Sequence, residues 1–265
     1  MKRRSAEGFI IAAMLGLILQ ACQATGVGVS ATGEEKALLT KGDTARALGR
    51  YGQAKEYYTE AAVLSKGAVR AHLELAGIHR RDGDEAAARH ILKEAYTLNP
   101  RNLEVAKGYA QSLLLAGEAQ DAARIAAEAL EHYPHDVRLL NLCGIALDRL
   151  ERHTEAQKLY VQAMDESATA EDREVTANNH ALSLVASREY DAAIRMVETH
   201  TPDARSKTVS RQLLALIYGV KGDTDRAYEL GLRDLSLVQV NENLRFYRQL
   251  HEGAVPMETL FMPVE

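Results

Sequence analysis

The sequence predicts an all-α fold, a right-handed superhelical solenoid of about six helical hairpins with a capping helix at its C-terminal end. The strongest observation is a ladder of alanines spaced by 34 residues, which comprises Ala54, Ala88, Ala122 and Ala156 and is repeated at Ala61, Ala95, Ala129 and Ala163. A fixed period of this length indicates stacked hairpins, in which small side chains let neighbouring helices approach closely. We call the first helix of each hairpin helix A and the second helix B.

Composition supports the same fold class. The 265-residue chain is 46% hydrophobic and only 5% aromatic, and it has no tryptophan, which suits helices packed through alanine and leucine better than a sheet. Its net charge of −5 is spread along the sequence without a block of five like charges. We therefore expect one elongated module and neither a nucleic acid nor a small-molecule partner.

Four units align without a gap from residue 35. The small site of helix A is occupied by Gly42, Ala76, Ala110 and Gly144, and the turn between helices by Gly49, Gly83, Gly117 and Glu151. Glycine at the turn indicates a positive φ, and Pro100 and Pro134 indicate the ends of two helices B. The bulky site of helix B reads Tyr58, Leu92, Ala126 and Tyr160, so we expect the third unit to be underfilled and locally weaker.

Two degenerate units follow and complete an array over residues 35–239. Ala181 and Ala193 resume the pattern after 37 residues, and Ala215 and Ala227 continue it after 34 more, while His200 and Asp234 replace the last alanine. We interpret the three extra residues as a longer loop at residues 166–173. Residues 240–265 are expected to form a capping helix followed by an irregular tail.

The first residues form a separate segment. Basic residues 2–4 precede the apolar run Phe9–Leu19, whose 11 residues are too few to span a bilayer, which needs ~20, but suit a secretory signal. We assign residues 1–21 to a signal peptide and residues 22–34, rich in Gly, Ser, Thr and Ala, to a flexible tether. The remaining cysteine, Cys143, is expected to be a buried core thiol without a disulfide partner.

Leu-Gln-Ala-Cys at residues 19–22 resembles the lipobox of bacterial lipoproteins. That resemblance implies cleavage before Cys22, attachment of lipid to its thiol and anchoring without a membrane span. Because Gln23 and not an aspartate follows the cysteine, it further implies the outer membrane, with the array facing the periplasm. An ordinary signal peptide with a chance cysteine is the alternative.

A partner-binding groove is expected on the concave side of the array, lined by helix A positions three, four or seven apart. The candidates are Leu39, Asp43, Leu73, Arg80, Lys107, Gln111, Asn141, Ile145, Asn178, Leu182, Gln212 and Leu216. This mixed lining suits an extended or helical peptide held by hydrophobic anchors, with Asn141 and Asn178 bonding to its backbone unless they are ordinary surface residues.

No catalytic or metal-binding motif is evident. His72 and His79 lie seven apart on one predicted helix but have no third ligand at a matching spacing, so no metal or cofactor is expected. Isolated carboxylates such as Asp43 and Asp148 are interpreted as solvated helix faces. We therefore expect a protein that is not an enzyme, and a periplasmic hydrolase is the least supported alternative.

Over residues 35–239 the units resemble the tetratricopeptide repeat family. With Cys22 and the ending Asn-Leu-Arg-Phe-Tyr-Arg at 243–248, the whole chain resembles the TadD-type lipoproteins of the tight-adherence (Flp) pilus system, and the pilotins of type IV pilus systems share the layout. The resemblance implies an outer-membrane adaptor that binds a secretin or another pilus component and assists pilus assembly. A scaffold for outer-membrane protein insertion or cell-wall synthesis is the alternative.

Overall fold

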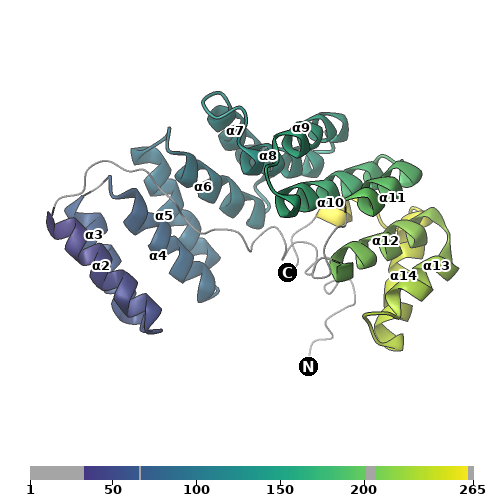
Figure 1. The fold of residues 1–265 in the computed structure, drawn as a ribbon, viewed down its shortest axis with the longest axis horizontal. Helices are drawn as coiled ribbons and strands as arrows, with labels where there is room; N and C mark the ends of the chain where they lie inside the picture. Colours follow the sequence, from purple (N-terminus) through teal and green to yellow (C-terminus); the bar gives the residue numbers. More distant parts are fainter. Residues whose placement is uncertain (1–32, 66, 201–206, 262–265) are drawn as a thin grey trace. The chain divides into compact units, whose positions relative to one another are not determined.

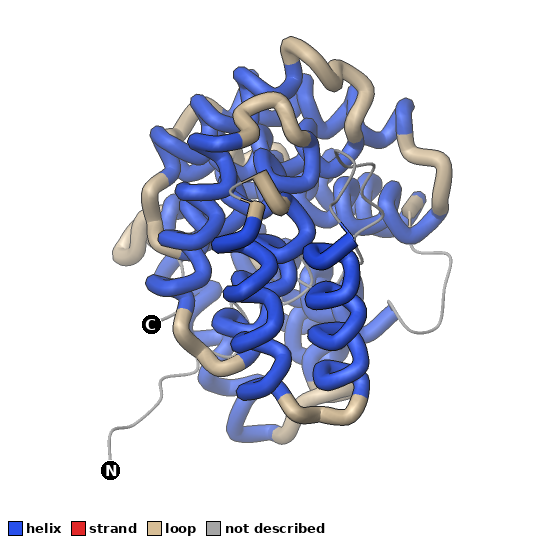
Figure 2. Tube along the Cα trace, turned by 90° about the vertical axis from the view of Figure 1, so that its left-hand side faces the viewer, coloured by secondary structure: helices blue, strands red, loops and turns tan. Residues whose placement is uncertain are grey.

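The computed structural model describes residues 33–65, 67–200 and 207–261. These residues form thirteen α-helices and one 3₁₀-helix, and no strand occurs among them (Figure 2). The predicted all-α fold of stacked hairpins is therefore confirmed. The predicted signal peptide, Cys22 and nearly all of the predicted tether lie outside the described residues.

The described chain divides into two compact units (Figure 1). The first unit, up to Pro134, contains three hairpins. Its helices are α2 (Gly33–Ala47), α3 (Tyr51–Leu64), α4 (Val69–Arg81), α5 (Glu85–Leu98), α6 (Leu103–Leu115) and α7 (Ala119–Leu130). Each even-numbered helix here is a helix A and packs on the helix B that follows it.

The second unit begins at His135 and contains three more hairpins and the C-terminal elements. The hairpins are α8 (Val137–Arg149) with α9 (His153–Glu166), α10 (Ala170–Ala186) with α11 (Tyr190–Thr199), and α12 (Lys207–Lys221) with α13 (Thr224–Gly231). A capping helix, α14 (Leu237–His251), packs on α12 and α13. The 3₁₀-helix η2 (Met257–Phe261) follows it.

The turn between helix A and helix B has a positive φ in every hairpin. Gly49, Gly83 and Gly117 adopt φ values of 72°, 80° and 78°, as the glycine spacing predicts. Glu151 and Arg188 occupy the same place in the next two hairpins with φ values of 60° and 63°. The left-handed turn is therefore imposed by the hairpin even where the residue has a side chain that disfavours it.

The alanine ladder packs the hairpins as predicted. All eight of its alanines are at most 4% exposed, and the bulky helix B site is fully buried in the first four hairpins. A side chain added at Gly42 would place its Cβ 2.5 Å from the ring of Tyr58, and Gly144 stands equally close to Tyr160. Glycine in helix A therefore accommodates tyrosine in helix B, whereas hairpins with alanine in helix A carry smaller residues.

The third hairpin has alanine at both of these sites. Ala110 and Ala126 are both fully buried, although neither side chain is large. The lower local stability of this hairpin stays a prediction.

The longer loop predicted at residues 166–173 is wrong. α9 ends at Glu166 and α10 begins at Ala170, so only three residues join them, while α10 reaches 17 residues against 13 in α8. The side chain of Thr169 accepts a hydrogen bond from the backbone N–H of Asp172 at 3.0 Å, and this N-cap starts the helix early. The extra residues therefore lengthen helix A.

The degenerate hairpins have short helices B. α11 and α13 have 10 and 8 residues, whereas α9 has 14, so His200 and Asp234 lie beyond the helix ends. Neither position makes the close helix contact that requires alanine. Asp234 instead accepts hydrogen bonds from Nε of Arg211 at 2.6 Å and Nε2 of Gln212 at 3.0 Å.

The tail differs from the irregular segment that was expected. η2 contacts α8 and α10, two helices A, and its three large apolar side chains are buried. It is the yellow element beside α10 in Figure 1. The end of the chain thus packs on the side of the second unit where partner residues were expected.

Candidate functional site

The helix A face of the first unit keeps four of its six candidate residues partly exposed. These are Asp43 on α2, Leu73 and Arg80 on α4, and Lys107 on α6, and the last two of these helices contact each other directly. Leu39 and Gln111 are each 6% exposed. One apolar side chain and three charged ones are therefore accessible on three helices of this unit.

The charges on this face are compensated between helices. Asp43 on α2 accepts a hydrogen bond from the hydroxyl of Tyr58 at 2.9 Å and pairs with Arg70 on α4. In the opposite sense, Arg46 on α2 pairs with Glu74 on α4 at 3.4 Å. Burial, followed by the bond to Asp43, raises the pKa of Tyr58, so its hydroxyl remains a donor. The expectation that Asp43 is merely a solvated carboxylate is therefore wrong.

The remaining charged candidates also have partners. Nε of Arg80 lies 3.8 Å from Glu85, and Nζ of Lys107 lies 2.7 Å from Glu104 on the same helix. Both pairs are partly buried, with the Lys107 side chain 12% and the Arg80 side chain 21% exposed. A peptide with charges of both signs would find complementary groups here.

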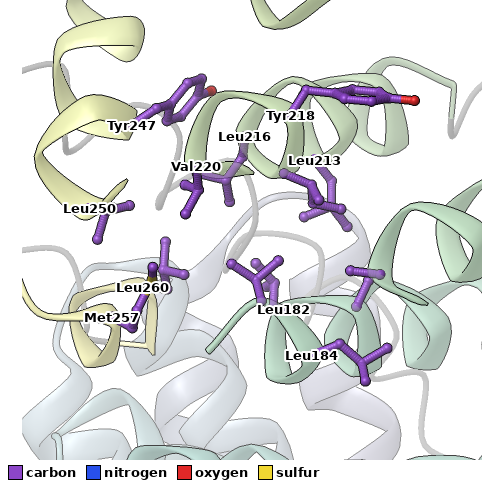
Figure 3. Close-up of a cluster of buried hydrophobic side chains, with 14 of the residues drawn as sticks. Leu182, Leu184, Leu213, Leu216, Tyr218, Val220, Tyr247, Leu250, Met257 and Leu260 are labelled. Carbon is purple, nitrogen blue, oxygen red and sulfur yellow. The ribbon is translucent and has the colours of Figure 1, made fainter. Parts of the chain in front are cut away.

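The helix A face of the second unit is closed. Asn141, Ile145, Leu182 and Gln212 are 5–9% exposed and Leu216 is fully buried, so of the six candidates only Asn178 is partly exposed. Leu182 and Leu216 lie in one hydrophobic cluster with Met257 and Leu260 of η2 and Leu250 of α14 (Figure 3). These leucines therefore belong to a core that is completed by the C-terminal elements.

Asn141, which was expected to bond to the backbone of a bound peptide, is hydrogen-bonded within the protein. Nδ2 of Asn179 on α10 donates to Oδ1 of Asn141 on α8 at 3.1 Å. Asn178 is partly exposed and its neighbour Asn179 is 7% exposed. Asn141 thus joins two helices A.

A buried polar cluster at Asp148 was missed from the sequence. Asp148 is fully buried and accepts hydrogen bonds from the hydroxyls of Tyr160 and Ser183 at 2.8 Å and 2.6 Å. Nδ1 of His153 lies 2.8 Å from Oδ1 of Asp148, the same oxygen that accepts from Ser183. The signal was available, since a fully buried tyrosine at the bulky helix B site requires a partner for its hydroxyl, as Tyr58 also does.

The electrostatics of this cluster follow from its burial. Desolvation raises the pKa of Asp148 even though three groups donate to it, and the bond to Asp148 is the main cause that raises the pKa of His153. Ser183 donates to the carboxylate and not to the imidazole, so the serine–histidine contact of a hydrolytic triad does not form. The cluster fastens α8, α9 and α10 together.

His72 and His79, the two histidines that were considered as metal ligands, make other contacts. Nδ1 of His72 lies 2.8 Å from the carbonyl oxygen of Ala68, and His79 lies 3.5 Å from Asp84. No group of three or more metal-ligating side chains was found among the residues that the structure describes. Cys143 is buried there as a free thiol, and burial raises its pKa to about 11, which makes it a poor nucleophile.

None of the helices in the described part of the chain is both long and apolar enough to cross a membrane.

Comparison with family models identifies the repeat. Two models described as tetratricopeptide repeat match residues 39–102 and 79–145, which together cover most of the first three hairpins and part of α8. Residues 39–145 therefore match tetratricopeptide repeats, and the described residues have the all-helical fold of a tetratricopeptide solenoid. Such repeats are binding modules that stack into an extended surface.

Solved structures of similar fold include PilF, PilW and MamA. PilF of Pseudomonas aeruginosa is 19% identical with a TM-score of 0.60, and the match covers 79% of this chain and 96% of that one. PilW, a type IV pilus biogenesis factor, is 14% identical with a TM-score of 0.66, covering 82% and 99%. MamA of Desulfovibrio magneticus RS-1 is 16% identical with a TM-score of 0.56, covering 64% and 95%. No curated protein matches the sequence.

Proposed function

We propose that the protein is a non-enzymatic, lipid-anchored adaptor of the outer membrane that binds a peptide segment of a secretin or another pilus component and assists assembly of a Flp-type pilus. The observation that carries the proposal is the helix A face of the first unit, where Leu73 is partly exposed, as are the charged side chains of Asp43, Arg80 and Lys107, and could serve as an apolar anchor. A peptide in an extended or helical form would be held by such an anchor and by these charged side chains.

The similarity to PilF and PilW supports a role in pilus assembly, since almost the whole length of each of those chains is covered. The resemblance of residues 19–22 to a lipobox supports the membrane anchor and the periplasm-facing orientation. The tight-adherence system in particular is supported by the layout of the sequence, from Cys22 to the ending at residues 243–248.

Affinity capture tests the partner. The tagged full chain is incubated with detergent-solubilised membranes, and recovered proteins are identified by mass spectrometry. We expect a secretin or another pilus protein, and we expect Leu73→Asp to abolish its recovery because a charge replaces the apolar anchor. Val63→Asp is the matched control, since Val63 on α3 is 75% exposed and lies on a helix B.

Recovery without any pilus-system protein would contradict the proposal. Recovery of proteins that insert outer-membrane proteins or build the cell wall would favour the alternative scaffold. Equal recovery with Leu73→Asp and Val63→Asp would show that the helix A face of the first unit is not the binding surface.

A separate experiment tests the anchor. Cys22→Ser removes the thiol that the lipid would modify, so the protein should move from the membrane fraction to the soluble fraction while its helical circular dichroism is unchanged. Val27→Ser, a similar change within the predicted tether, should leave fractionation unaltered. Membrane association that persists in Cys22→Ser would exclude lipid anchoring at this residue.

A further inference from the structure

The helix A face of the second unit is covered by the chain's own C-terminal segment. Met257, Leu260 and Phe261 of η2 are 8%, 7% and 7% exposed, and they belong to the same cluster as Leu182 of α10 and Leu216 of α12 (Figure 3). η2 contacts α8 and α10, the helices A of two successive hairpins. The segment therefore lies where tetratricopeptide hairpins present their binding face.

Two residues of this segment also interact with His153 of α9. The ring of Phe261 lies 5.8 Å, between centroids, from the imidazole of His153 at the start of α9. Glu258 is one of the carboxylates whose charge raises the pKa of that imidazole. Three apolar side chains and one carboxylate thus define what this surface accepts.

The capping helix α14 shares a hydrophobic cluster with the tail but also makes contacts of its own with α12. The ring of Tyr247 packs against Gly219 of α12 so closely that no side chain fits there, and Nδ1 of His251 lies 2.8 Å from the carbonyl oxygen of Val220. The five residues of η2 form a short 3₁₀-helix, a type with poor hydrogen-bond geometry. Gly253, with a φ of 72°, and Pro256 separate the two elements. Release of η2 would therefore leave the hairpins and their cap in place.

We propose that Met257–Phe261 is an internal ligand of the second unit, and that the partner displaces it with a peptide segment of the same chemistry, in addition to the segment that binds the first unit. This inference rests on the proposed function, because it supplies the chemical class of the peptide. The peptide carries large apolar side chains at positions i, i+3 and i+4, with a carboxylate at i+1 that faces His153. Only molecules in which η2 has left this surface can bind the peptide. The apparent affinity is therefore the intrinsic affinity multiplied by the fraction of such molecules.

Peptide binding in trans tests the proposal. The probe is a fluorescein-labelled peptide of residues 255–261, Val-Pro-Met-Glu-Thr-Leu-Phe, and binding is measured by fluorescence anisotropy with the full chain in detergent. The double variant Leu260→Ala with Phe261→Ala weakens the tail and should bind the probe about tenfold more tightly than the native chain. Adding Leu182→Asp to that variant should abolish binding.

The matched control is Leu237→Ala with Val238→Ala. These side chains are 55% and 66% exposed on α14, so their removal deletes a comparable amount of apolar surface in the same unit without touching the covered face. The control should bind the probe as weakly as the native chain. If the tail variant binds no more tightly than this control, the proposal is wrong.

Hydrogen exchange in the native full chain gives a readout that does not depend on a variant folding. Amides of residues 257–261 should exchange faster than those of α14, because the tail opens locally while the cap stays folded. Exchange of both segments only by global unfolding would show that η2 is a permanent part of the core, which would overturn the proposal.

The two proposals fail separately. Capture of a pilus protein whose recovery the tail peptide does not reduce would leave the proposed function intact and refute the internal ligand. Tight binding of the probe to the tail variant, with no pilus protein recovered from membranes, would support the internal ligand and count against the proposed function.

Discussion

The two units are built from the same hairpin, but they differ in how the helices are packed and in whether the helix A face is covered. In the first unit, small residues at fixed positions pack the helices and the helix A face keeps charged side chains partly exposed. In the second unit, helices B shorten, a buried polar cluster joins three helices, and the C-terminal elements cover the helix A face. A repeat that departs from its consensus therefore replaces the lost packing with specific contacts, and those contacts also decide which face is open.

Removing Asp148 should have the largest effect of these changes on the free energy of unfolding, and it should exceed the effect of the equivalent change in the first unit. Asp148→Ala leaves the hydroxyls of Tyr160 and Ser183 buried without their acceptor, so we expect a loss of about 3–5 kcal/mol in the free energy of unfolding. Asp43→Ala removes the equivalent acceptor from Tyr58 at a partly exposed site and should cost about 1 kcal/mol. Urea denaturation followed by circular dichroism measures both, and equal losses would contradict the contrast between the units.

Overpacking tests the alanine ladder of the first unit. Ala122 is fully buried, so Ala122→Phe forces a ring into a close helix contact and should cost about 1–3 kcal/mol. Gln120→Phe, two residues away at an exposed position of α7, is the control and should change the melting temperature little. An unaltered melting temperature in Ala122→Phe would show that the repeat register is wrong.

Local signals in the sequence were sufficient for the repeated part of the fold. The alanines and the turn glycines act within one hairpin or between adjacent ones, so their spacing predicts their place directly. The same kind of signal at Thr169, with Asp172 three residues later, indicates a helix start, and neglecting it produced the incorrect loop.

The second unit was predicted less well because its decisive contacts join residues far apart in the chain. From the sequence alone Asp148 is interpreted as a surface carboxylate, because nothing shows that Tyr160 and Ser183 bond to it. Leu182 is likewise interpreted as a groove residue, because nothing shows that Met257 and Leu260 share its cluster. No period relates these partners. In the described part of the first unit, by contrast, the helices A contact neighbouring helices of the stack.

Relaxing the strained turns should give a gain of about 1 kcal/mol per site. Arg188 and Glu151 hold positive φ values without being glycine, so Arg188→Gly and Glu151→Gly remove the clash of Cβ with the backbone. Gly83→Ala, at the same turn position in the first unit, should destabilise by a similar amount. Thermal denaturation measures all three, and a loss of stability in Arg188→Gly would mean that its side chain contributes more than the strained conformation costs.

The smallest expected effect is a pH dependence confined to the second unit. His153 faces Asp148 from α8, Glu151 in the preceding turn and Glu258 from η2, and its pKa is raised above the ordinary value of 6.5. A group whose pKa is raised by folding stabilises the folded state fully below its unfolded value, and this contribution is lost as pH rises through the folded value.

Stability should therefore fall as pH rises from 6.5 through the raised pKa of His153, and His153→Gln should flatten that slope. Burial raises the pKa of Asp148 as well, which gives a slope of the same sign but at lower pH, since its unfolded value is near 3.8. His180, whose pKa burial lowers from 6.5 to about 4, gives a slope of the opposite sign between these two values, and its contribution fades as pH rises above 6.5. His90→Gln, at an exposed site of the first unit, should leave the slope unchanged. Because Glu258 is one source of the shift, Glu258→Gln should reduce the slope by part of the His153→Gln effect, and an undiminished slope would mean that η2 does not hold its carboxylate near this imidazole in solution.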